Sequence, residues 1–271
     1  MPELLRPQSL DEAADLIARH GAAAAVLAGG TSLMRETYPS DGGYLIGVDR
    51  LGLDKVVARD GGWSIGAAVP LSVLREAVPI PALQAATREF GGPAVQNMAT
   101  VGGNLFARAP FGDLAPALLA LGARLIFATA DGETTQAIED FYAGWADGAP
   151  PRTGLLTRIE LDVPAGDAAY LKCARRRYST PSVVTVAACV AKEGDTVTDA
   201  RIALSGAHAH PLRCAAAERA VIGSSLDEAA IAAAAQAAEG AVAPQTDAVA
   251  SDWYRRRMTG VFVGRVLAAL A

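Results

Sequence analysis

The stretch TVGGNLFARAPFGDLAPALLALGARL, residues 100–125, places two adjacent glycines, an asparagine and a lone aspartate directly before a long apolar run. Glycine costs backbone entropy in regular structure, so a Gly-Gly pair is typical of a turn that needs positive φ or close approach by another group. The run that follows predicts a helix, LAPALLAL, which turns at Gly122 into a strand, LIFAT. The pattern therefore predicts a ligand-facing loop beside a buried core.

A second stretch, VLAGGTSL at residues 26–33, follows an apolar strand and again joins Gly-Gly to hydroxyl residues. Free backbone N–H groups at such turns form concavities that bind anions, and glycine lets a diphosphate come close. Thr31, Ser32 and Thr100 add hydroxyl donors, and Asp113 offers an acceptor for a ribose. On these residues alone, plain loops and a helix cap at Asp113 are the more common explanations of the pattern.

The two commonest nucleotide signatures are excluded. No two glycines are separated by a single residue, which excludes a G-x-G-x-x-G dinucleotide fingerprint. No glycine is followed by lysine, which excludes a Walker A loop. Any nucleotide must therefore be held in another way.

The bulk composition bounds the function. The chain has 271 residues, 51% of them hydrophobic and 20% charged, with a formal net charge of -5, so we expect a globular protein that binds no nucleic acid. Cys173, Cys189 and Cys214 stand far apart, which argues against a cysteine-ligated metal site and favours a reducing compartment. From the sequence as given we expect neither a secretory leader nor a membrane-spanning run. We predict a cytoplasmic protein without a transmembrane segment, a metal site or a catalytic side chain of its own.

Local patterns predict two successive units. Ser9 and Glu12 form a capping box that begins the first helix, and a Pro/Gly/Asp turn marks a boundary near residue 165. Beyond it come strands (AYLKCARR, SVVTVAACVA, VTDARIALSGA) and then two helices, the first predicted to begin at a capping box of Ser225 and Glu228. Met34 is predicted to lie in the core, and the arginines at 255–257 on a solvated face.

Taken in order, VLAGGTSL, TVGGN with an aspartate nine residues after its asparagine, LLTRIELDVP and YLKCARRR resemble one family. It is that of the FAD-binding medium subunits of molybdenum hydroxylases, which includes carbon monoxide dehydrogenase and xanthine dehydrogenase. The resemblance runs from RPQSLDEAADLIARHG to SDWYRRRMTGVFVGRVLAAL. It implies an α+β fold: a two-lobed FAD-binding domain over residues 1–164 (lobes about 1–52 and 53–164), similar to vanillyl-alcohol-oxidase-type (PCMH) flavoproteins, then a C-terminal α+β domain over 165–271.

The resemblance also implies where FAD lies. The two glycine loops hold its pyrophosphate, Asp113 binds the adenosine ribose, and Lys172 lies close to the flavin. An aromatic residue and two leucines contact the cofactor near its ring systems. The implied cofactor-binding residues are Val26, Leu27, Ala28, Gly29, Gly30, Thr31, Ser32, Leu33, Phe90, Ala99, Thr100, Gly102, Gly103, Asn104, Asp113, Leu155, Leu156 and Lys172.

Two departures from the family pattern stand out. Many relatives carry a basic residue directly before VLAGG, where this chain has Ala25, so one phosphate contact is in doubt. Where xanthine dehydrogenases show acidic residues, this chain reads YSTPS at residues 178–182, so the usual NAD-facing chemistry is not assumed.

The function implied by the resemblance is electron transfer. A molybdopterin-binding large subunit would hydroxylate the substrate, and a small subunit with [2Fe-2S] clusters would pass electrons to FAD on this chain, in a dimer of heterotrimers. The external acceptor, whether oxygen, a quinone or NAD, stays open. Two alternatives also stay open: a self-sufficient flavin oxidoreductase of the enolpyruvyl-reductase or vanillyl-alcohol-oxidase type, and a flavin-free scaffold.

Overall fold

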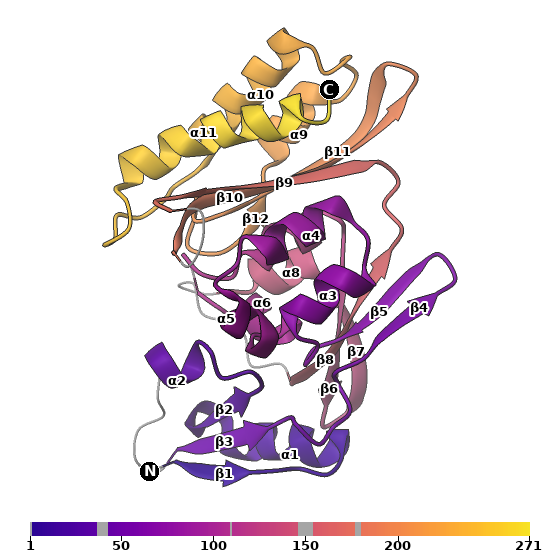
Figure 1. Ribbon diagram of the computed structural model, residues 1–271, viewed down its shortest axis with the longest axis vertical. Helices are drawn as coiled ribbons and strands as arrows, with labels where there is room; N and C mark the ends of the chain where they lie inside the picture. The colour runs from indigo at the N-terminus through magenta and orange to yellow at the C-terminus, as the bar shows by residue number, and fades with distance from the viewer. Residues whose placement is uncertain (1, 37–42, 109, 146–153, 177–179) are drawn as a thin grey trace.

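Three sheets follow one another along the long axis of the molecule in a computed structural model of the chain (Figure 1). It describes residues 2–36, 43–108, 110–145, 154–176 and 180–271. A three-stranded sheet forms the N-terminal end, a five-stranded sheet the middle, and a four-stranded sheet with the last helices the C-terminal end. The predicted α+β fold class is confirmed by this mixture of helix and sheet.

The first sheet is parallel, in the order β1-β3-β2. The helix that crosses it begins as predicted, because the Ser9 hydroxyl accepts a hydrogen bond from the N–H of Glu12 at 3.1 Å. It ends at Gly21, where φ is 48°. The elements are β1 (Glu3–Leu5), α1 (Leu10–His20), a 3-10 turn (Gly21–Ala23), β2 (Ala24–Leu27), α2 (Leu33–Glu36) and β3 (Tyr44–Gly47).

The second sheet is antiparallel, in the order β4-β5-β8-β6-β7. Its strands are β4 (Val56–Arg59), β5 (Gly62–Gly66), β6 (Arg124–Thr129), β7 (Gly132–Ala137) and β8 (Leu155–Asp162). Its helices are α3 (Leu71–Ala77), α4 (Pro81–Arg88), α5 (Pro93–Met98), α6 (Val101–Leu105), α7 (Leu114–Ala120) and α8 (Ile138–Ala143).

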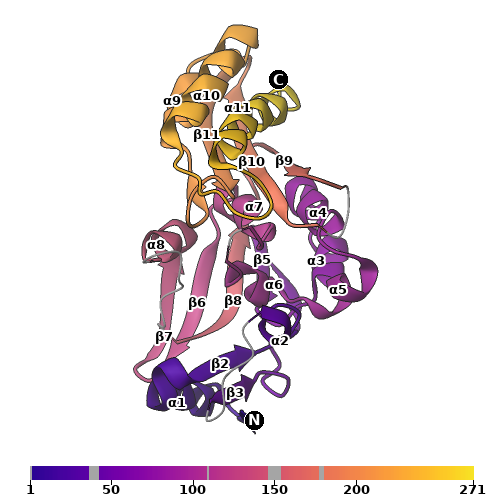
Figure 2. The ribbon, with the colours of Figure 1, turned by 90° about the vertical axis from the view of Figure 1, so that its left-hand side faces the viewer.

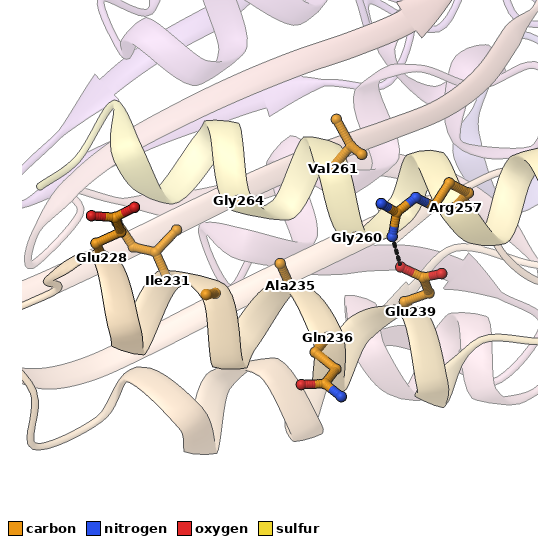
Figure 3. Close-up of a pocket in the computed structure, with 10 residues that line it drawn as sticks. Glu228, Ile231, Ala235, Gln236, Glu239, Arg257, Gly260, Val261 and Gly264 are labelled. Carbon is orange, nitrogen blue, oxygen red and sulfur yellow. Dashed lines mark hydrogen bonds and ion pairs between the residues drawn. The ribbon is translucent and has the colours of Figure 1, made fainter.

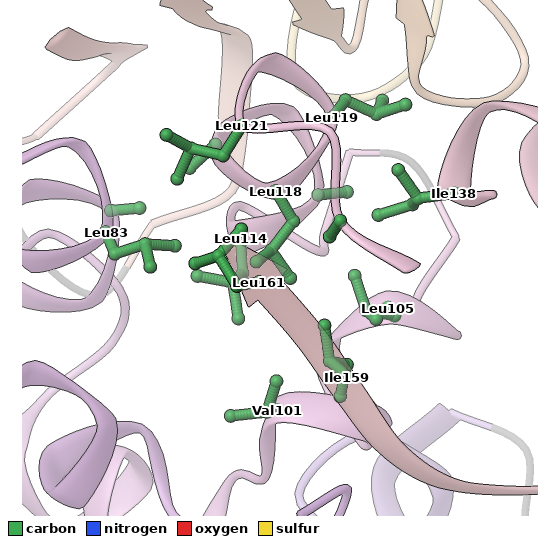
Figure 4. Packing of buried hydrophobic residues seen from close by; sticks show 14 of the residues in the cluster. Leu83, Val101, Leu105, Leu114, Leu118, Leu119, Leu121, Ile138, Ile159 and Leu161 are labelled. Atoms are coloured by element: carbon green, nitrogen blue, oxygen red, sulfur yellow. The ribbon is translucent and has the colours of Figure 1, made fainter. Parts of the chain in front are cut away.

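Helix α7 lies at the centre of the main core. Every one of its residues is buried, and its leucines pack among Leu105, Ile138 and Ile159 (Figure 4). The helix ends at Leu121, and Gly122 takes a φ of 67° before β6 begins at Arg124. The predicted helix, turn and strand are therefore confirmed. The buried run places the residue before it, Asp113, at the rim of this core.

The third sheet has helices on both faces (Figures 1 and 2). Alternate residues of β10 point to opposite sides: Val186 and Ala188 face the last helices, whereas Ala187 packs in the main core beside α7. Its order is β12-β11-β10-β9. The elements are β9 (Asp167–Ala174), β10 (Ser182–Glu193), β11 (Thr196–Ser205), β12 (Leu212–Arg213), α9 (Ala215–Val221), α10 (Glu228–Ala241) and α11 (Asp252–Ala268).

The start of α10 differs from the prediction. Asp227, rather than Ser225, caps this helix, and its carboxylate accepts from the N–H of Ala230 at 2.9 Å. The Ser225 hydroxyl instead donates to Asp227 at 3.3 Å. Aspartate is as good an N-cap as serine, and it stands directly before the helix here. No helix in the described ranges is long and apolar enough to cross a bilayer.

Candidate functional site

The first glycine loop leaves β2 at the edge of the parallel sheet. Gly30 has a φ of 69°, which suits glycine, and α2 begins where the N–H of Met34 donates to the carbonyl of Gly30 at 3.1 Å. The N–H groups of Gly29, Gly30 and Thr31 have no acceptor within the described part of the chain. This loop therefore offers successive backbone donors, as the sequence predicts for an anion site.

The first glycine loop (residues 28–31) follows β2 of the three-stranded sheet, the second (residues 98–103) spans the end of α5 and the start of α6, and the two lie against each other. A Cβ at Gly29 would overlap the carbonyl oxygen of Met98 and lie 3.2 Å from Cα of Ala99, directly before Thr100. Only glycine lets the backbones approach so closely. The structure thus brings residues 28–31 and 98–103 together, although 67 residues lie between Thr31 and Ala99.

The glycine stretch at residues 100–104, TVGGN, is the start of a helix rather than a free turn. Thr100 caps α6, and its hydroxyl accepts from the N–H of Gly103 at 3.1 Å. The N–H groups of Val101 and Gly102 donate to Val69 and Ala67, at 2.9 and 2.8 Å. The expectation of free N–H groups in this stretch is therefore wrong, because the protein itself uses these donors.

The two glycines of this helix have different surroundings. A Cβ at Gly102 would lie 2.9 Å from both Cβ and the carbonyl oxygen of Ala67, so this glycine serves packing between α6 and the strand end. A Cβ at Gly103 would meet only the Thr100 hydroxyl, at 2.9 Å. Space for a ligand therefore lies on the Gly103 side, where the Thr100 hydroxyl still has a proton to donate.

Asn104 and Asp113 are linked through the first turn of α7. The Asn104 side chain accepts from the N–H of Leu114 at 2.9 Å and is buried. Asp113 occupies the N-cap position, yet its side chain makes no capping hydrogen bond. The helix-cap interpretation of Asp113 is therefore wrong: Asn104 supplies the cap, and the Asp113 carboxylate is free to point elsewhere.

The Asp113 carboxylate lies in a buried ion pair with Lys172 of β9. Lys172 Nζ is 2.6 Å from one carboxylate oxygen, and the Ser182 hydroxyl donates to the other at 2.5 Å. Lys172 Nζ also donates to the carbonyl of Glu89 at 3.3 Å. The two charged side chains are only 3% and 6% exposed. We call Asp113, Lys172 and Ser182 the Asp113 cluster.

The Asp113 cluster joins two residues that the family resemblance assigns to different parts of FAD. Since Lys172 and Asp113 touch, the structure places these two predicted site residues at one point. Each carboxylate oxygen accepts one hydrogen bond here and has a second lone pair, so Asp113 retains acceptors for hydroxyl groups. Ser182 was not among the site residues predicted from the sequence; its only signal was the departure of YSTPS from the family pattern.

Two further hydroxyls are buried beside the cluster. Tyr170 and Thr185 are 5% and 0% exposed, and their hydroxyl groups have no hydrogen-bond partner among the described residues. Burial raises the pKa of the Tyr170 phenol well above its ordinary value, and the negative charges of Asp113 and Glu89 raise it further. The phenol is therefore neutral at physiological pH.

The three remaining predicted cofactor contacts, Leu155, Leu156 and Phe90, pack in or against hydrophobic clusters. Leu155 packs with Ala13 and Val48 between the two lobes, and Leu156 lies in the main core; each is 3% exposed. Phe90 is partly buried, and its carbonyl accepts from the Gln96 side chain at 2.9 Å. For these three residues, cofactor contact stays a prediction.

Exposed methionines border the glycine loops. Met34, which was predicted to lie in the core, is 46% exposed, and its Cγ lies 3.3 Å from where a Cβ of Gly30 would be. Met98 is 59% exposed. The core prediction for Met34 is wrong because β2 ends before it and α2 turns it outward. Of the loop's other apolar residues, Val26 is exposed, while Leu27, Ala28 and Leu33 are half-buried.

A separate hollow of about 630 Å³ lies between α10 and α11 (Figure 3). Alanines and glycines of the two helices form part of its lining, and Arg257 and Glu239 pair across it at 3.0 Å. It lies at the opposite end of the molecule from the glycine loops (Figure 1). No group of three or more metal-ligating side chains occurs in the described ranges.

Two family models together match most of the chain. Residues 1–164 match the family described as "FAD binding domain in molybdopterin dehydrogenase", and residues 169–270 match "CO dehydrogenase flavoprotein C-terminal domain". The placement of the boundary near residue 165 stays a prediction.

Individual relatives match over most of their length. The glyceraldehyde dehydrogenase medium chain of Sulfolobus acidocaldarius is 29% identical, over 90% of this chain and 90% of the relative. The carbon monoxide dehydrogenase medium chain of Afipia carboxidovorans is 28% identical, over 97% and 94%. A solved structure of carbon monoxide dehydrogenase from Hydrogenophaga pseudoflava superposes with a TM-score of 0.90 at 28% identity, covering 99% of this chain and 96% of that chain.

Proposed function

This chain belongs to the FAD-binding medium subunits of the molybdenum hydroxylases, and we propose that it takes electrons from [2Fe-2S] clusters of a partner subunit and passes them to an external acceptor. The chain is thus an FAD-dependent oxidoreductase subunit. FAD, when bound, supplies the redox chemistry, while the protein supplies position and electrostatics.

One observation carries the binding proposal: two glycine loops meet, and within the described ranges the first leaves consecutive N–H groups without a protein acceptor. A pyrophosphate would accept hydrogen bonds from such successive donors. We assign Gly29, Gly30, Thr31 and the hydroxyl of Thr100 to this role. Gly103 would leave space for the pyrophosphate by its lack of a side chain, because its N–H group already donates to the Thr100 hydroxyl.

The Asp113 cluster supports contacts beyond the pyrophosphate. Asp113 has acceptor capacity for ribose hydroxyls, and Lys172 places a cation beside it. A cation near a flavin favours negative charge on the reduced ring. Because the two side chains form an ion pair, we infer that they act on the cofactor as one unit.

The proposal includes partners that the chain itself does not contain. We infer that it assembles with a molybdopterin-binding large subunit and a [2Fe-2S] small subunit, as a dimer of heterotrimers. The "medium chain" naming of its relatives supports such an assembly. All three cysteines are free thiols, which supports a cytoplasmic site of action.

The test is to purify the full chain and record its visible spectrum, first alone and then after co-expression with candidate large and small subunits. We expect a bound flavin spectrum from the chain alone, and iron and molybdenum in the co-purified complex. A flavin-free chain would contradict the binding proposal. A flavin-containing chain that never captures either partner would favour the self-sufficient oxidoreductase.

Asp113→Ala is expected to weaken FAD binding by about one to two orders of magnitude, because each hydrogen bond to a charged group contributes roughly 1.5–3 kcal/mol. Titration of the flavin-free chain with FAD, followed by flavin fluorescence, measures the change. Asp195→Ala, in the exposed turn between β10 and β11, is the control and should bind FAD as the wild type does. Unchanged affinity in Asp113→Ala together with a lower melting temperature would reduce Asp113 to a structural partner of Lys172.

A further inference from the structure

Arg255 of α11 is buried, contrary to the solvated face predicted for residues 255–257. It is 2% exposed, and its guanidinium donates to carbonyl oxygens of β10 and of the residue after β11. The acceptors are the carbonyls of Val183, Ser182 (3.4 Å) and Gly206 (3.3 Å). A buried cation is costly unless it is paired and hydrogen-bonded, so this arrangement needs an explanation.

Asp247 provides the counter-charge. Arg255 Nη2 lies 2.8 Å from each oxygen of the Asp247 carboxylate, which also accepts from the N–H groups of Val249 and Ala250. Burial raises the pKa of the Asp247 carboxyl, but these hydrogen bonds outweigh it and keep the pKa below its ordinary value. Arg255 is thereby anchored to the segment before α11.

The carbonyls that Arg255 holds lie at an irregular point of the sheet. The pairing of β10 with β9 shifts register between Ser182 and Val184, so Val183 falls outside the regular ladder. A bulge of this kind re-aims the neighbouring side chain and leaves backbone groups to be satisfied elsewhere. Here the Arg255 guanidinium donates to the carbonyl of Val183, which has no partner residue on β9.

The side chain beside this bulge is Ser182. Its hydroxyl donates to the Asp113 carboxylate at 2.5 Å, and its N–H donates to the carbonyl of Pro110 at 3.3 Å. Both contacts cross from the C-terminal sheet to the segment that carries Asp113. The position of Ser182 therefore decides which lone pairs of Asp113 remain available to a ligand.

We propose that Arg255 is a positioning residue of the FAD site: it fixes the β10 bulge and so holds the Ser182 hydroxyl on Asp113. The inference rests on the proposed FAD binding and extends it to the C-terminal helix, which packs on the face of the sheet opposite α7, the helix that begins directly after Asp113. Arg255 itself does not touch the cofactor.

A double-mutant cycle tests this coupling. Arg255→Met, Ser182→Ala and the double variant are made in the full chain, and FAD dissociation constants are measured by fluorescence titration. Each single variant is expected to weaken FAD binding about tenfold, and the double variant no more than about threefold further, because both remove the same contact. Arg257→Met is the matched control: Arg257 lies on the same helix, is 58% exposed and pairs with Glu239 (Figure 3), so FAD affinity should not change.

Either of two results would overturn the inference. One is an FAD affinity in Arg255→Met equal to that of the wild type, and the other is a loss in the double variant that multiplies to about a hundredfold. A wild-type chain that binds no FAD would instead contradict the proposed function, so the two failures are distinguishable. If Arg255→Met does not fold, Arg255→Lys replaces it in the cycle. Its ammonium still donates to the bulge carbonyls, so it should weaken binding by less than Ser182→Ala, and a loss equal to or larger than that would count against positioning.

Discussion

Gly29→Ala is expected to lower FAD affinity by roughly a hundredfold, because its Cβ cannot coexist with the carbonyl of Met98. A contact of 3.2 Å to Cα of Ala99 adds to the overlap. Relief of the overlap with the Met98 carbonyl requires the two glycine loops to move apart by more than about 1 Å, since non-bonded heavy atoms in contact lie near 3.5–4.0 Å. The donors of the first loop would then no longer face the same pyrophosphate as Thr100. Fluorescence titration with FAD measures the loss.

Gly240→Ala is the matched control for this substitution. Gly240 lies in α10, and a Cβ there meets no atom within 4 Å. Alanine is the better helix former, so this variant should bind FAD normally and be at least as stable as the wild type. Binding by Gly29→Ala within about threefold of the wild type, well short of the expected hundredfold, would show that the juxtaposed loops do not hold the cofactor.

Features that depend on neighbouring residues were predictable from the sequence. The capped start of α1 at Ser9 and the passage from α7 through Gly122 into β6 follow from local spacing and from glycine's access to positive φ. The first glycine loop also appears where its pattern predicts. In each case the determining contacts lie within a few residues.

The helical state of residues 101–105 was not predictable in this way. Two adjacent glycines disfavour helix, yet α6 forms because Val69 and Ala67 accept its first N–H groups and Thr100 caps it. Tertiary contacts here outweigh local propensity. They also remove the free donors that a Gly-Gly pair suggests.

The Asp113 cluster depends on contacts between residues 59 and 69 positions apart in the chain. No local pattern pairs Asp113 with Lys172 or Ser182, and the YRRR stretch gives no sign that Arg255 alone is buried. Charged residues in a row are usually solvated, and burial of one requires partners that only the folded chain assembles. The resemblance identified Asp113 and Lys172 individually but not their ion pair.

The ion pair between Asp113 and Lys172 leads to our last prediction, which concerns the thermal stability of the chain and then the potential of the flavin. Removing one partner of a buried pair leaves an unpaired charge and costs about 3–5 kcal/mol. Lys172→Met should therefore lower the melting temperature of the flavin-free chain by about 10 °C. Asp113→Asn combined with Lys172→Met removes both charges and should recover much of this loss. Thermal unfolding followed by circular dichroism measures both variants, and equal melting temperatures for the single and double variants would contradict the pairing.

The same variants test whether the pair acts on the flavin. In the wild type the two charges nearly cancel, so each single variant uncovers the other charge. Lys172→Met leaves a negative carboxylate and should lower the two-electron midpoint potential, whereas Asp113→Asn leaves a cation and should raise it. A unit charge at about 4 Å contributes roughly 4 kcal/mol at an effective dielectric of 20, and about 1.4 kcal/mol of this corresponds to 30 mV. Shifts of tens of millivolts in opposite directions, with the double variant near the wild type, are therefore expected in spectroelectrochemical titration. Identical midpoints in all four proteins would mean that the pair holds FAD at a distance from its ring without tuning it.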